Sequence, residues 1–247
     1  MEKVTNKFLV IFLFIVLYAT NGFAQFWTEA DEDLIYRRES VYGINFNTNG
    51  GLIGGVSFKH ARVINKFMFH SFSIEAVNVK HPKESRYQNI STGSSYIAGK
   101  SNYLYVLRPQ YGRELVLFQK AKEQGIQVNF IPAIGPTLGI VAPYLIRYEY
   151  LNGRVATEPY DSNVHQLSNI LGTGSFTESL SQASIVPGLS VKASVTFEFG
   201  TFKNNVTGFE AGFMVDGFTK EIIIMEEADN RQVYTSAFLT FFYGTRK

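Results

Sequence analysis

Residues 188–199 (GLSVKASVTFEF) alternate strictly between apolar and polar side chains, and this alternation limits the folds open to the chain. The odd positions are apolar, whereas the even positions include Lys192 and Glu198. In a β-strand this period of two gives two faces that meet different media. A soluble sandwich buries the apolar face in its core. A transmembrane barrel turns that face to lipid and crosses the membrane with strands of about 9–11 residues.

The N-terminus favours the barrel, because residues 1–24 have the pattern of a secretory signal peptide. Lys3 and Lys7 precede an apolar run over residues 8–18, and the small residues of Gly22-Phe23-Ala24 follow. This run is shorter than the roughly 20 residues of a spanning helix, which leaves an uncleaved anchor helix as the weaker alternative. We expect cleavage after Ala24, a periplasmic lead-in over 25–39 and a barrel domain over 40–247.

Composition agrees with an exported all-β protein and excludes several other classes. The chain has no cysteine, so it forms no disulfide and no thiolate–metal site. Its 23 Lys and Arg nearly balance its 21 Asp and Glu, and no basic stripe points to nucleic acid. The 22 Phe, 14 Tyr and 21 Gly are typical of strands of which only alternate residues face lipid.

Turn signals divide the sequence after residue 39 into eight strands of an antiparallel up-and-down transmembrane β-barrel. Long loops follow the third, fifth and seventh strands, and the second of these, 151–184, has room for a short helix near 164–171. Outer-membrane barrels sort their loops in this way, with long loops outside and short turns in the periplasm. Splitting two strands at Gly112 and Gly135 gives an alternative of ten. The eight predicted strands are 40–48, 52–60, 66–79, 101–119, 126–150, 188–199, 206–216 and 233–243.

Three segments, 77–84 (VNVKHPKE), 107–113 (LRPQYGR) and 133–139 (AIGPTLG), resemble segments of small outer-membrane β-barrel proteins of the Bacteroidota. The resemblance implies a location in the cell outer membrane. Some barrels of this type accompany the type IX protein secretion machinery, so it also implies an accessory subunit of that translocon. Both implications come from the resemblance and define a barrel family rather than an activity.

The alternation predicts charged side chains inside the barrel. An eight-stranded barrel is only wide enough for side chains to fill, so buried charges must pair with one another or with water. We expect an internal network of ion pairs that holds the strands in register; the alternative is a proton or ion path. The predicted lumen charges are Glu75, Arg108, Lys192, Glu198 and Glu210.

Two loop histidines offer the only pattern that suggests catalysis. His81 lies near Glu84 and Ser85, and His165 lies near Asp161 and Ser162, but a catalytic triad is recognised by geometry rather than composition. His60 and His70 show no metal-ligand spacing. We therefore expect no catalytic, cofactor or metal site.

The function predicted from the sequence is that of a non-enzymatic scaffold or accessory subunit. Such a barrel contacts outer-membrane lipid and other envelope proteins in a hetero-complex, and it binds no nucleic acid. Two alternatives stay open. One is a lipid-modifying enzyme with a His, Ser and acidic site in its loops, and the other is a narrow pore or small-solute binder.

Overall fold

The computed structural model describes residues 37–119, 125–199 and 204–247. The predicted signal peptide and most of the predicted lead-in lie outside these residues. The elements are β1 (Arg38–Asn47), β2 (Gly51–Asn65), β3 (Met68–Val79), β4 (Arg86–Gln88), β5 (Ser95–Ile97), β6 (Asn102–Phe118), β7 (Gln127–Pro143), β8 (Leu145–Glu149), β9 (Val155–Pro159), η3 (Leu167–Asn169), β10 (Ile170–Thr173), α2 (Phe176–Ser181), β11 (Ser184–Phe199), β12 (Asn205–Ile222) and β13 (Arg231–Arg246).

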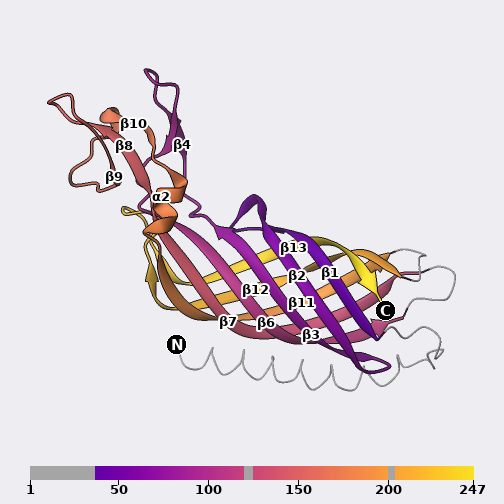
Figure 1. Cartoon of the computed structure of the whole chain (residues 1–247). Helices are drawn as coiled ribbons and strands as arrows, with labels where there is room; N and C mark the ends of the chain where they lie inside the picture. The colour runs from indigo at the N-terminus through magenta and orange to yellow at the C-terminus, as the bar shows by residue number, and fades with distance from the viewer. Residues whose placement is uncertain (1–36, 120–124, 200–203) are drawn as a thin grey trace, which may run out of the picture.

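Eight of these strands form a closed antiparallel barrel (Figure 1), in the order β1-β13-β12-β11-β7-β6-β3-β2. The first and last strands close it through nine paired positions, from Glu39 with Arg246 to Asn47 with Phe238. Closure leaves no sheet edge, so every strand finds backbone partners on both sides. The predicted eight-stranded barrel is confirmed, and the ten-stranded alternative is wrong.

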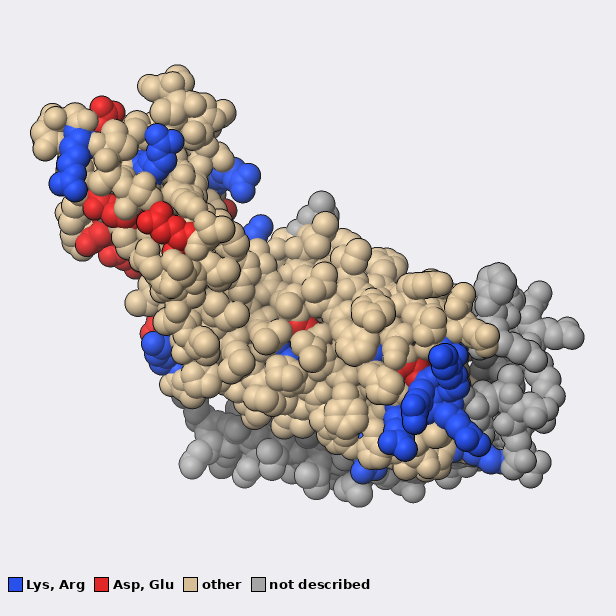
Figure 2. All heavy atoms as spheres, viewed as in Figure 1, with Lys and Arg blue, Asp and Glu red and all other residues tan. Residues whose placement is uncertain are grey.

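The faces of the barrel strands follow the alternation of the sequence. In β11 the side chains of Leu189 and Val191 are exposed, whereas Lys192 and Glu198 are buried inside. Few charged side chains appear on the middle of the barrel face in Figure 2, because the other strands repeat this pattern and build an apolar outer surface. Its exposed members include Tyr42, Ile44, Val56, Phe72, Ile74, Ile134, Leu189, Val191, Phe213, Val215, Phe241 and Tyr243.

Several strand boundaries differ from the predicted ones. β1 starts at Arg38, two residues before the predicted start, and β13 continues to Arg246, three residues past the predicted end. The predicted strand 126–150 divides at Tyr144 into barrel strand β7 and loop strand β8. Prolines, which lack a ladder donor, obscured the limits of β7 in the sequence, but this strand accepts Pro132, Pro136 and Pro143 within its 17 residues.

The two longest loops fold together beyond one end of the barrel. β4 and β5 form a hairpin, and β8 pairs with both β9 and β10 in a three-stranded sheet. Figure 1 shows these strands standing clear of the barrel, with α2 beside its rim. We call residues 80–101 and 144–183 the outer loop region. The helix expected near 164–171 is wrong, since the structure has only the 3-10 turn η3 there and places α2 at Phe176–Ser181.

Among the described residues, no helix combines the length and the apolar character that a bilayer crossing requires.

Candidate functional site: a packed charged lumen under a folded loop region

The half of the lumen toward the start of β1 and the end of β13, which we call the lower half, holds five charged side chains that are linked to one another. Lys59 Nζ on β2 lies 3.0 Å from Glu114 Oε2 on β6 and 3.4 Å from Glu39 Oε1 on β1. Arg246 on β13 donates through Nε to the other Glu39 oxygen at 2.6 Å and through Nη2 to Glu198 on β11. Each carboxylate therefore meets at least one cation, although these residues lie far apart in the sequence.

Asn129 connects the carboxylates of this lower group. The Asn129 Nδ2 donates to Glu114 Oε1 and, at 3.0 Å, to Glu198 Oε1. Its side-chain oxygen Oδ1 accepts a hydrogen bond from Gln127 Nε2 at 3.0 Å. Oxygens of Glu39, Glu114 and Glu198 come within 4.8 Å of one another, the spacing of a cation site. Lys59 and Arg246 already supply positive charge to these oxygens, so the arrangement is that of an ion-pair cluster.

The middle of the lumen holds a second group of five charges. Lys192 Nζ lies 2.8 Å from Glu75 Oε1 and 3.1 Å from Glu210 Oε1. Arg108 grips Asp216 with two parallel bonds, from Nε at 2.9 Å and from Nη2 at 2.5 Å. Its Nη1 also lies 3.7 Å from Glu75 Oε2, which joins the two pairs into one network. A bidentate contact of this kind fixes orientation as well as charge.

All five predicted lumen charges lie inside the barrel, in these two groups. The prediction did not include Glu39, Lys59, Glu114, Asp216 and Arg246, which belong to the same network. The alternation of their strands already placed Lys59 and Asp216 inward. Glu114 lies six residues after Arg108 on the same strand, so the alternation places both side chains on the same face. Glu39 and Arg246 were missed because they lie just outside the predicted strand limits.

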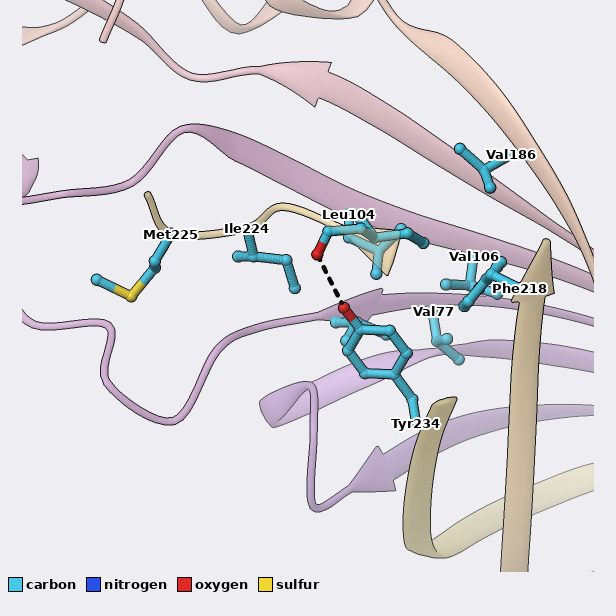
Figure 3. Close-up of a cluster of buried hydrophobic side chains, with 10 residues drawn as sticks. Val77, Leu104, Val106, Val186, Phe218, Ile224, Met225 and Tyr234 are labelled. Atoms are coloured by element: carbon cyan, nitrogen blue, oxygen red, sulfur yellow. Dashed lines mark hydrogen bonds between the residues drawn. The ribbon is translucent and has the colours of Figure 1, made fainter. Parts of the chain in front are cut away.

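Apolar side chains close the lumen above the charges, at the loop end. Ten buried residues pack together there, and the Tyr234 hydroxyl donates to the Ile222 carbonyl at 3.4 Å (Figure 3). Smaller apolar clusters lie among the charges toward the opposite end, where Phe242 packs with Val41 and Val206. The barrel interior is thus a packed core that is apolar at the loop end and holds both charged and apolar side chains below it. The ten residues of the loop-end cluster are Val77, Val79, Leu104, Val106, Val186, Phe218, Ile222, Ile224, Met225 and Tyr234.

The outer loop region has its own core of aromatic side chains. Tyr144, Ile146, Tyr148 and Ile170 are buried together, and five further partly buried apolar residues pack around them. The Tyr144 hydroxyl also accepts a hydrogen bond from the Ile97 amide at 2.8 Å, which ties the β4–β5 loop to the β7–β8 junction. These contacts make the loops a folded unit.

The two loop histidines form hydrogen bonds within the loops that surround them. His165 is buried, its Nδ1 accepts from the Asp161 amide at 3.0 Å, and its Nε2 lies 3.3 Å from Glu158 Oε1. The Tyr150 hydroxyl donates to the same Glu158 oxygen at 2.6 Å, and this hydrogen bond is the main reason that the pKa of Glu158 lies below its usual value. His165 also lowers it.

His81 uses its ring to shape the loop around it. Its Nδ1 accepts from the Lys83 amide at 3.2 Å, and its Nε2 lies 3.4 Å from the Asp229 carbonyl. Within the described part of the chain, neither His81 nor His165 hydrogen-bonds to a serine hydroxyl. Among the described residues, the one contact of this kind joins Ser40 Oγ and His60 Nδ1, 2.8 Å apart on the outer face of β1 and β2, and no carboxylate of these residues hydrogen-bonds to that imidazole.

Comparison with known proteins adds a general likeness in fold. No protein-family model and no curated protein matches this sequence. Among solved structures, it is similar to Ail, the attachment invasion locus protein of Yersinia pestis, at 10% identity and a TM-score of 0.41, over 86% of this chain and all of that one. Neisserial surface protein A is similar at 11% identity and a TM-score of 0.40, over 85% of this chain and 96% of that one. Both scores are low, so the class of the barrel depends on its own register and surface.

The closed sheet and the two faces of the barrel show that lipid surrounds the strands. A closed sheet satisfies every backbone group internally, which is the condition for strands that cross a hydrocarbon layer. The outer face is apolar and the inner face charged, the reverse of a water-soluble barrel. The protein is an outer-membrane β-barrel.

Proposed function

We propose that this protein is a non-enzymatic scaffold of the outer membrane whose outer loop region binds another envelope protein. The proposal rests on one observation: the outer loop region is folded, yet the apolar side chains at its turns are fully exposed. Ile90, in the turn between β4 and β5, and Leu151, in the turn between β8 and β9, are both 100% exposed. Tyr87, Val155, Val164 and Leu167 are exposed on the same unit.

Apolar side chains at these positions have no lipid to contact, because the loop region stands beyond the rim of the barrel. Exposed apolar groups that are presented on an ordered surface are typical of protein interaction sites. The lumen offers no comparable surface, since apolar clusters and ion pairs fill it. A scaffold role accounts for both features, whereas a pore or a solute binder would need an open interior.

The resemblance of three sequence segments to barrels that accompany type IX secretion suggests one candidate complex. In this proposal the barrel anchors the complex in the membrane, and the loop region contacts a large translocon component on the outer side. This finer identification rests on the sequence resemblance alone.

The experiment is a mild-detergent pull-down of the tagged full-length protein from its native envelope, with co-purifying chains identified by mass spectrometry. The test variant combines Ile90→Ser with Leu151→Ser, and the control replaces the exposed Lys83 of the same loop with Ser. We expect wild type and control to recover one partner stoichiometrically, and the test variant to lose most of it. Equal recovery by all three, or recovery of the barrel alone, would contradict the proposal. Type IX translocon components among the partners would identify the complex.

A further inference from the structure

Four basic or imidazole side chains form a row across the outer face of the barrel, near the end where β1 begins and β13 ends. Arg38 pairs with Arg62, Arg62 with His70, and His70 with Arg113, so the row crosses four neighbouring strands. We call these residues the basic row. All three arginines are exposed, and Figure 2 shows a cluster of Lys and Arg at this end of the barrel.

Among the residues that the structure describes, no acidic side chain lies beside the basic row on the outer face. The sequence neighbours Glu39 and Glu114 point into the lumen, where they are 1% and 0% exposed. Within the described ranges, none of the three arginines forms an ion pair with a carboxylate, although Arg113 contacts the Met68 sulfur at 3.3 Å. Arg38 and Arg62 lie directly opposite each other, and like charges at such positions repel, so an anion bound beside them would relieve this repulsion.

The two rows of outward-facing residues next to the basic row indicate that its positive charge lies at the boundary of a lipid layer. The next row toward the barrel centre is partly polar, with Tyr111 OH 2.7 Å from His70 Nδ1 and packed on Phe72 at 5.2 Å between ring centroids. The row after it is apolar. These two rows are Ser40, His60, Phe72 and Tyr111, and then Tyr42, Phe58, Ile74 and Pro109.

The spacing of the rows fits a phospholipid. Two residues of a strand tilted by about 40° advance about 5 Å through the membrane, so the apolar row lies about 10 Å deeper than the basic row. The basic row lies at the depth of a lipid phosphate, the row with amphipathic rings at the depth of the glycerol region, and the apolar row at the depth of the acyl chains. Because the strands are tilted, the first and last residues of the basic row differ in depth along the membrane normal by about 9 Å. Long arginine side chains can bend toward the headgroup level, which reduces this difference in the depth of their charges.

We propose that the basic row, with the two rows above it, binds the headgroup of an anionic phospholipid in the periplasmic leaflet of the outer membrane. The arginines contact the phosphate, for which the planar guanidinium is well suited, while Phe72 and Ile74 contact the acyl chain. Positive charge near a membrane surface attracts anionic lipid, and basic patches between membrane segments bind such headgroups. The site requires only the membrane barrel and does not depend on the proposed scaffold function.

The test measures lipid retention by native mass spectrometry. Full-length protein is released from nanodiscs that contain equal amounts of phosphatidylglycerol and phosphatidylcholine, and the bound lipids are counted. The test variant combines Arg38→Gln with Arg62→Gln. A matched control removes the same charge from the outer loop region through Arg147→Gln with Arg154→Gln. The shift of the folded band on unheated gels shows that each variant has formed its barrel.

We expect wild type and control to retain phosphatidylglycerol in preference to phosphatidylcholine. Each arginine removed from the basic row should weaken this retention about five-fold. Equal retention of the two lipids by wild type, or an equal loss in the control, would overturn the proposal. Complete displacement by millimolar inorganic phosphate would show a simple phosphate site instead of a lipid site. If the test variant kept its lipid but lost a co-purified protein from native envelopes, the row would be a protein interface, which also overturns the proposal.

Discussion

Lys59 holds two buried carboxylates in place, and its side chain is 8% exposed. Charges in such an environment are tolerated only as hydrogen-bonded pairs, because each one has lost its water. The amine also lies 5.6 Å from the centre of the Phe242 ring, which belongs to an apolar cluster in the lower half of the lumen. Removing this single cation should affect the lower half of the barrel as a unit.

The variant Lys59→Met should lower the free energy of unfolding by about 3–5 kcal/mol, since it leaves Glu39 and Glu114 without their shared cation. Urea unfolding of the barrel in lipid vesicles measures this change. Lys220→Met, at an exposed position on β12, is the control and should shift stability by less than about 0.5 kcal/mol. Adding Glu114→Gln to Lys59→Met should restore part of the loss, and a further loss in the double variant would contradict the pairing.

Glu158 makes the outer loop region sensitive to acid. Hydrogen bonds from Tyr150 and His165 lower the pKa of Glu158 in the folded loops. A lowered folded pKa means that the stabilisation is present above the unfolded value, about 4.3, and is lost as the pH falls through the folded value. The loops should therefore become more susceptible to an acid-active protease below about pH 4, while the barrel stays folded. Glu158→Gln should remove this step, and an unchanged pH profile in that variant would refute the assignment.

At the scale of elements, β6 and β7 lie close together where a proline interrupts their ladder. The β6–β7 ladder passes from the Leu107–Leu138 pair to the Tyr111–Ile134 pair, with Pro109 between them. A Cβ at Gly135 on β7 would lie 2.1 Å from the Pro109 carbonyl oxygen and 2.7 Å from the Gln110 Cα. The absence of a side chain at Gly135 is thus a requirement of strand pairing.

Gly135→Ala should destabilise the barrel by about 1–3 kcal/mol, because the added methyl meets backbone atoms that cannot rotate away. Gly217→Ala on β12 is the matched control, since a Cβ there would meet nothing within 4 Å. The midpoint of thermal unfolding on gels compares the two variants. Equal midpoints would show that β6 and β7 can move apart at little cost.

At the scale of the whole molecule, the closed lumen predicts that the protein does not conduct ions. Purified protein in planar bilayers should give currents no larger than those of a protein-free bilayer. Combining Phe218→Ala with Tyr234→Ala removes the two large rings of the loop-end cluster, but the ion pairs of Lys192 and Arg108 still fill the barrel below it. This variant should also fail to conduct. A stable open channel in the wild type would disprove the packed lumen.

The sequence by itself determined which way each barrel strand faces. The alternation in residues 188–199 reports that one face meets lipid and the other meets polar groups, and this is a local property of any strand. For the same reason the alternation placed Glu75, Lys192 and Glu210 inside, without knowledge of their partners. The even strand number and the sorting of long and short loops also follow from turn residues that lie along the sequence.

Only the tertiary structure decided which groups meet. Glu39 and Arg246 lie 207 positions apart and come together because the first and last strands close the barrel in one register. Arg108 and Asp216 face each other across the lumen, a relation that no periodicity along either strand contains. The same is true of the basic row and of the loop sheet. Strand alternation is set by local backbone geometry, whereas cross-strand partners are set by closure and register, which depend on the whole barrel at once.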